Sequence, residues 1–186
     1  MARLYANITL RGVSQNDAAA YLTDHGDVAM VTPESRGSIV VFHADLGGQE
    51  DLTARLSSRF NCPALLAMGF NERVLLYQLY ESGEQTDAYV SWPHEGLELE
   101  PPAPQGNAER LCAAFEVERH AFRVERILRK EGKPGEPYGL AVNRHGELAR
   151  ALGMPIVAAG SSYELLELGE LPHDSDLSAG QLVRTG

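Results

Sequence analysis

The segment HAD, at residues 43–45, is the best local candidate for chemistry in this sequence. His43 and Asp45 follow the apolar run GSIVVF and precede two glycines. A strand that ends beside the start of a helix often builds a site, and His with Asp can form an acid–base pair. Asp45 and the glycines can also do no more than shape a turn. We therefore treat His43 and Asp45 as catalytic candidates for a small hydrolase or transferase.

A second candidate is a run of cations spaced for one face of a helix. Arg119, Arg123, Arg126 and Lys130 recur at intervals of four, three and four residues, which places them on a common helical face. Residues 119–150 hold 8 basic and 4 acidic side chains, a net +4 in a chain of net charge −10. Three interpretations stay open: a solvated face, docking against the acidic first half of the chain, or contact with phosphate.

The frame Y-x-L-x-E-x-G-E occurs twice, at residues 77–84 and 163–170. Alternating side chains followed by Gly are typical of a strand that ends in a turn, so we expect this structure at both places. A duplicated ligand loop that carries glutamates from both copies is the alternative. The first copy lies in a predicted hairpin, QLYESGEQTDAY, whose Tyr80 and Glu81 we take as binding candidates.

Sequence patterns of cofactor, metal and nucleophile sites do not occur in this chain. The six histidines form no H-x-x-x-H or H-E-x-x-H, and Cys62 and Cys112 form no C-x-x-C. LGGQEDL lacks the G-x-G-x-x-G and G-K-[ST] patterns of nucleotide loops, and no G-x-S-x-G elbow exists. We expect no cofactor, no bound metal, and two reduced, buried cysteines.

The bulk composition is that of a soluble, acidic globular protein. The chain has 186 residues, of which 44% are hydrophobic. No apolar run approaches the ~18 residues that span a bilayer, and polar residues interrupt the N-terminal MARLYANITLRG. We therefore expect a cytoplasmic protein without membrane contact. Because an acidic chain repels phosphate backbones, a protein partner or a second copy of the chain is expected rather than nucleic acid.

Periodicity predicts an α+β fold for residues 1–92. Alternating or short apolar runs indicate strands at residues 3–12, 27–33, 37–45, 62–70, 73–82 and 86–92. Capped, amphipathic runs indicate helices at residues 14–26 and 48–61. The order β-α-β-β-α-β followed by a hairpin predicts a ferredoxin-like two-layer sandwich, with both helices on one face of an antiparallel sheet.

The remaining residues predict a linker, a second small domain and a tail. Three prolines within four residues and several acidic side chains indicate a linker at residues 93–106. Residues 107–172 then predict a small, mainly helical domain, with helices at 107–117, 118–132 and 143–153 and short strands at 155–160 and 162–172. The polar residues 173–186 are expected to form a flexible tail.

One segment of the second half suggests DNA binding. GELARALGMP, at residues 146–155, is typical of the first helix of a helix-turn-helix pair. The segment after it offers Tyr163 and several glutamates where a recognition helix needs Arg, Lys, Asn or Gln. Helix-turn-helix DNA binding is therefore the third alternative.

Several segments together resemble a family of uncharacterised bacterial hypothetical proteins. They are LYANITLRG, CPALLAM with VLLYQLYESGE and DAY, NAERLCAAF, and LARALGMP with YELLELGELP. The resemblance implies a bacterial lineage and carries over no activity and no catalytic residue. The first hypothesis from the sequence is a non-enzymatic binding or protein-interaction protein that uses the hairpin and the cation run as contact surfaces.

Overall fold

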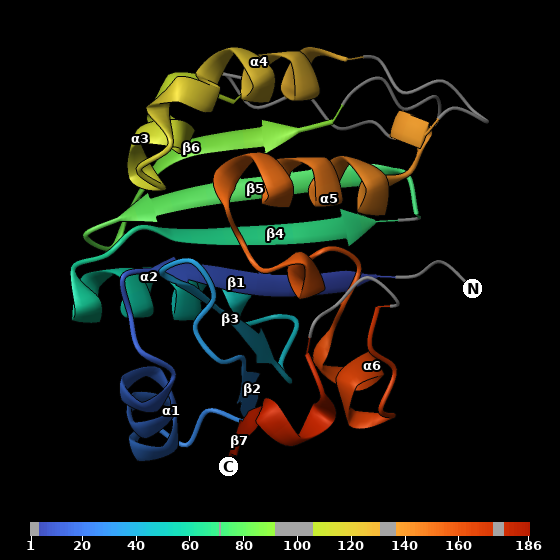
Figure 1. Cartoon of the computed structure of the whole chain (residues 1–186). Coiled ribbons are helices and arrows are strands. Elements are labelled where there is room, and N and C mark those ends of the chain that lie inside the picture. The colour runs from blue at the N-terminus through green and yellow to red at the C-terminus, as the bar shows by residue number, and fades with distance from the viewer. Residues whose placement is uncertain (1–3, 71, 92–105, 131–136, 173–176) are drawn as a thin grey trace.

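Seven strands form one antiparallel sheet at the centre of the protein (Figure 1). The structure is a computed structural model that describes residues 4–70, 72–91, 106–130, 137–172 and 177–186. The sheet has the strand order β6-β5-β4-β1-β3-β2-β7. The strands are β1 (Tyr5–Arg11), β2 (Ala29–Val31), β3 (Ser38–His43), β4 (Ala64–Phe70), β5 (Val74–Glu81), β6 (Glu84–Val90) and β7 (Val183–Thr185). The predicted α+β class is confirmed.

Six α-helices in the described residues cover both faces of this sheet. They are α1 (Gln15–Asp24), α2 (Gln49–Phe60), α3 (Ala108–Ala114), α4 (Ala121–Arg129), α5 (Ala141–Leu152) and α6 (Tyr163–Glu167). Strand alternation separates two apolar cores: Ile8 and Val41 pack under α1 and α2, whereas Val40 and Phe42 pack under the later helices. None of the described helices is long and apolar enough to cross a membrane.

The strands and helices of the first half follow the sequence prediction closely. Ser14 begins α1, where its side chain accepts a hydrogen bond from the backbone N–H of Asp17. The predicted hairpin is β5–β6, and its turn residues Ser82 and Gly83 have φ of 54° and 86°. Two consecutive positive φ values are the geometry of the tight turn that matches strand twist. The first copy of the Y-x-L-x-E-x-G-E frame is therefore a strand followed by a turn.

The second copy of the frame is not a strand, and this prediction was wrong. Residues 163–167 form α6, and Ile156–Ala158 form a 3₁₀ turn where another strand was expected. The hydroxyl of Ser162 caps α6 by accepting from the backbone N–H of Leu165 at 3.4 Å. Tyr163 and Leu166, three positions apart, are buried on one side of the helix. A cap and helical spacing override the alternating pattern, and only the Gly with positive φ, Gly169 at 77°, is shared with the first copy.

The division into two separate domains is not confirmed, because helices of the second half pack on the sheet of the first. One apolar core contains Leu75 and Tyr77 of β5 together with Leu111, Phe115 and Leu148 of the later helices. Residues 93–105 of the predicted linker lie outside the described residues. The predicted linker ends at Gly106, whose backbone N–H donates to the carbonyl of Ala88 on β6 at 2.8 Å.

The predicted flexible tail contains a strand of the sheet. β7 pairs with β2 in antiparallel register, with Ala29 opposite Thr185. The Thr185 hydroxyl donates to the carbonyl of Asp27 at 2.8 Å and accepts from the backbone N–H of Ala29 at 3.0 Å. A three-residue strand has too few residues for its periodicity to be recognised in the sequence. Residues 173–176 lie outside the described part of the chain.

Candidate functional site

His43 and Asp45 lie together at the end of β3, but their side chains do not form an acid–base pair. The Nδ1 atom of His43 is 3.0 Å from the backbone carbonyl oxygen of Asp45, not from its carboxylate. The Asp45 carboxylate instead accepts from the backbone N–H of Gly47 at 2.9 Å. Asp45 therefore shapes the turn before α2, which is the structural alternative that the sequence left open.

The carboxylate nearest to the other nitrogen of His43 belongs to Asp27, which the sequence did not identify. His43 Nε2 is 3.6 Å from Asp27 Oδ1. Both terminal nitrogens of Arg55 donate to the Asp27 carboxylate at 3.0 and 3.1 Å, and this hydrogen bonding raises the pKa of the Arg55 guanidinium. The His43 side chain is only 9% exposed. The contacts among Asp27, His43 and Arg55 therefore join β3 and α2 to the loop before β2, and they leave His43 little accessible to a substrate.

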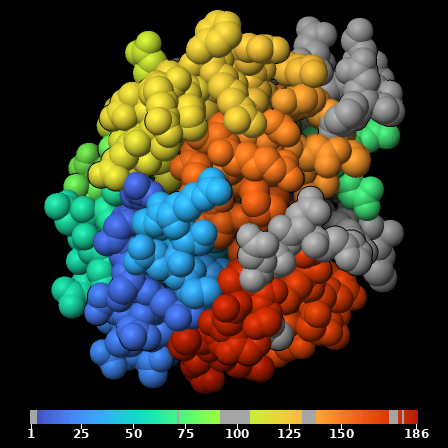
Figure 2. Space-filling view, in the orientation of Figure 1, coloured from blue at the N-terminus to red at the C-terminus, as the bar shows by residue number. Residues whose placement is uncertain are grey.

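The four predicted cations lie on the outer surface of the α4 segment. Arg119 stands in the 3₁₀ turn Glu118–His120 that leads into α4, and Lys130 ends the helix. Val124, Ile127 and Leu128 form the opposite, buried side of α4. The yellow side chains of the α3–α4 segment form the upper margin of the molecule in Figure 2. All four cations are exposed.

Phe122 is the most exposed large apolar side chain of the described residues and lies among these cations. It is 77% exposed, three positions after Arg119 and four before Arg126, and we call Arg119, Phe122, Arg123 and Arg126 the α4 face. Arg123 is 3.3 Å from the carboxylate of Glu147. Arg119 and Arg126 have no ion-pair partner in the described part of the chain, so the α4 face retains positive charge. A helical wheel of residues 121–128 already places Phe122 away from the apolar side.

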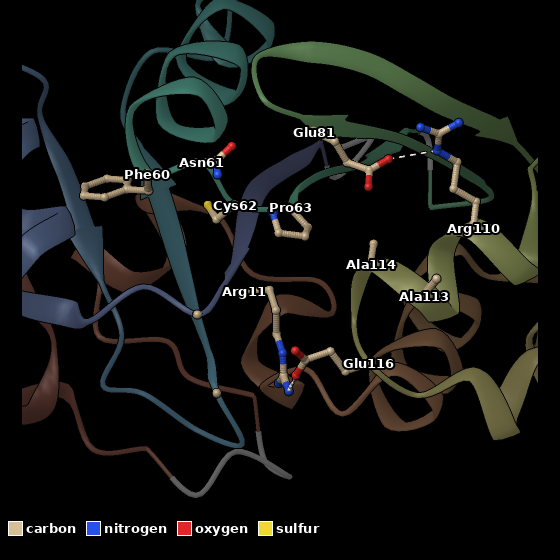
Figure 3. Close-up of a pocket in the computed structure, with 12 residues that line it drawn as sticks. Arg11, Phe60, Asn61, Cys62, Pro63, Glu81, Arg110, Ala113, Ala114 and Glu116 are labelled. Atoms are coloured by element: carbon tan, nitrogen blue, oxygen red, sulfur yellow. Dashed lines mark hydrogen bonds and ion pairs between the residues drawn. The ribbon is translucent and has the colours of Figure 1, made fainter.

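The two hairpin candidates have different environments. Tyr80 is 7% exposed and packs in the core under α1 and α2, so its ring is not available as a contact surface. Glu81 ends β5 and faces a cleft, where it accepts from Arg110 Nε at 2.8 Å (Figure 3). Arg110 of α3 was not a candidate from the sequence, because only the packing of α3 against the end of the sheet brings it there.

The cleft lies at one end of the sheet, between α2 and α3. Its volume is about 770 Å³, and Arg11, Cys62 and Glu116 also line it. Cys62 is free and buried, as is Cys112, as predicted. Burial raises the pKa of the Cys62 thiol to about 11, which keeps it protonated and unreactive near neutral pH. Among the described residues no group of three or more His, Cys, Asp or Glu side chains is arranged to hold a metal ion.

In the described part of the second half, α5 is not followed by a long helix of the kind that reads DNA. The helix that follows α5 is α6, which has five residues. Tyr163 and Leu166 are buried, and its exposed positions include Glu164 and Glu167. Negative side chains at these positions would repel a phosphate backbone.

Comparison of the chain with protein-family models, curated proteins and solved structures finds no match.

Proposed function

We propose that the protein is a non-enzymatic interaction protein that binds an acidic segment of a partner protein through the α4 face. The observation that carries this proposal is the 77% exposed side chain of Phe122, which lies one to four positions along the chain from the exposed residues Arg119, Arg123 and Arg126. Aromatic side chains and Arg are enriched at the energetic centres of protein interfaces. The ring has no role in the core, because α4 already buries a separate apolar side.

The charge distribution supports a short acidic partner rather than a nucleic acid. Residues 119–150 carry a net +4, whereas the chain as a whole carries −10. A short acidic segment meets only the α4 face and gains from opposite charge there. A long duplex extends past this face and meets the repulsion of the remaining surface.

The enclosure of His43 favours an interaction protein over the enzymatic alternative, because a general base has to reach its substrate.

We also propose that β4-β1-β3-β2, with α1 and α2 on one face, form a ferredoxin-like unit. The strand order and the antiparallel pairings support this proposal. A cytoplasmic location agrees with this reduced, acidic protein.

Reversing two charges of the α4 face tests the proposal. The probe is a fluorescein-labelled peptide in which Leu and Trp are interspersed among Asp and Glu, followed by fluorescence anisotropy. Replacing both Arg123 and Arg126 with Glu is expected to weaken binding roughly tenfold or more, since opposite charges become like charges. Phe122→Ser is expected to weaken binding about fivefold or more while leaving stability within about 0.5 kcal/mol.

A double variant on other surfaces provides the matched control. Arg59 and Arg73 are exposed and have no ion-pair partner among the described residues. Changing both to Glu alters the net charge by the same amount as the α4 double variant and is expected to change affinity less than about threefold. Equal losses in the two double variants would contradict the proposal, as would tighter binding of an oligonucleotide of similar length.

A further inference from the structure

The cleft between α2 and α3 has two charged pairs on opposite sides of an apolar floor (Figure 3). One pair is Arg11 with Glu116, and the other is Arg110 with Glu81. Pro63 and Ala114 lie between the two pairs in Figure 3, and Phe60 and Cys62 extend the apolar lining. A volume of about 770 Å³ is within the usual range of small-molecule sites.

In the first pair the guanidinium is fixed and the carboxylate is exposed. Arg11 is 20% exposed in its side chain and donates both to the carbonyl of Arg36 and to Glu116, at 2.7 Å for the second contact. A Cβ on Gly37 would lie 2.8 Å from Arg11 Nη1, so the guanidinium lies close against the backbone there. The Glu116 side chain is 74% exposed. Because exposed ion pairs contribute little free energy, a ligand carboxylate can replace Glu116 on Arg11.

In the second pair the carboxylate is the better fixed member. Glu81 is 34% exposed in its side chain and accepts from the Thr86 hydroxyl at 2.7 Å as well as from Arg110 at 2.8 Å. Partial burial alone would raise the pKa of Glu81, but these two donors lower it, so the group stays ionised at neutral pH. The Arg110 side chain is more exposed, at 47%. A ligand ammonium group can therefore replace Arg110 on Glu81.

We propose that this cleft binds a zwitterion, namely an amino acid or short peptide with an apolar body. Its carboxylate would bind Arg11, its ammonium group would bind Glu81, and its apolar part would lie on Pro63 and Ala114. Arg11 already binds a carboxylate, that of Glu116, and Glu81 already binds a cation, that of Arg110. Each of the two therefore matches one charged end of the ligand. This inference is independent of the α4 face, which lies on the outer surface of a different helix.

Titration with charge-blocked ligands tests the inference. The probes are L-leucine, dileucine and trileucine, each compared with its N-acetyl form and its C-terminal amide, with binding followed by backbone amide shifts in ¹⁵N-labelled protein. For at least one length, the free zwitterion is expected to shift the backbone amides of residues 60–62 and 113–116. Blocking either end is expected to weaken its binding roughly tenfold or more, because one charge-assisted contact is lost.

Three variants separate ligand binding from a structural role. Arg11→Met and Glu81→Gln are each expected to weaken binding of the zwitterion roughly tenfold or more. Glu116→Gln removes the carboxylate that competes with the ligand, so it is expected to strengthen binding by up to about fivefold. The inference is overturned if none of the three zwitterions shifts the cleft amides, if blocked and free ligands bind equally, or if Glu116→Gln weakens binding. The α4 proposal stands or falls separately, by the acidic peptide.

Discussion

Replacing Arg144 with Met is expected to lower the free energy of unfolding by about 2–4 kcal/mol. Arg144 lies on α5 and is 2% exposed. Its guanidinium donates to the backbone carbonyl oxygen of Ile127 and, at 2.6 Å, to that of Lys130. Both carbonyls lie at the C-terminal end of α4. A helix leaves its last carbonyls without internal partners, and a cation there also interacts favourably with the helix dipole. Met retains a long apolar side chain but removes both the donors and the positive charge.

Urea unfolding followed by circular dichroism at neutral pH measures this loss. The control is Arg150→Met on the same helix, because Arg150 is 46% exposed in its side chain and its contact with Glu147 is 3.7 Å long. Exposed ion pairs of this kind contribute about 0–1 kcal/mol, so the control is expected to lose no more than that. Similar losses of unfolding free energy in the two variants would show that the hydrogen bonds from Arg144 to the last carbonyl oxygens of α4 contribute little to stability.

Stability is expected to decrease by about 3 kcal/mol as the pH falls from 6.5 to 4, through His145 alone. His145 lies on α5 and is 1% exposed. Its Nδ1 atom is 3.2 Å from the Tyr5 hydroxyl, and its Nε2 atom has no hydrogen-bond partner among the described residues. Burial lowers the pKa of His145 to about 4. In the unfolded chain a histidine has a pKa of about 6.5.

The sign of this effect follows from where the proton is bound. Between pH 6.5 and 4 the unfolded chain carries a proton on His145 that the folded chain does not carry, so acid favours unfolding. Above pH 6.5 both states are neutral at this residue and the contribution is constant. The measurement is the free energy of unfolding in urea at several pH values, for the wild type and for His145→Gln. Carboxylates contribute equally to the pH dependence of both proteins. Parallel curves of unfolding free energy against pH would therefore contradict the assignment of the effect to His145.

The sequence predicts the first half of the fold well because its signals are local. Ser14 and Gly26 bound α1, alternation identifies β1, and a short apolar run identifies β3. The frame at residues 163–170 shows the limit of such signals, because its alternation is the same as that of β5. Burial of Tyr163 and Leu166 on one side of a capped turn selects the helix instead. The pairing of β7 with β2 is likewise a tertiary effect that three residues cannot encode in their own pattern.

The sequence predicts a candidate site well when all of its residues lie in one segment of the chain. The spacing of Arg119, Arg123 and Arg126 is a property of one helix, so the sequence alone predicts that they share a face. The partner of His43 was missed because strand pairing between β2 and β3, not proximity in sequence, brings Asp27 to it. Arg110 was missed for the same reason, since helix packing brings α3 to the end of β5.

The most direct test of the central claim is a chemical-shift map of ¹⁵N-labelled protein titrated with the acidic peptide. The claim is that the α4 face, centred on Phe122, is the contact surface. The account predicts that the largest amide shifts fall within residues 119–130, and that they are lost when Arg123 and Arg126 are both changed to Glu. Largest shifts in the β5–β6 hairpin or around His43, or no shifts at a large excess of peptide, would contradict it.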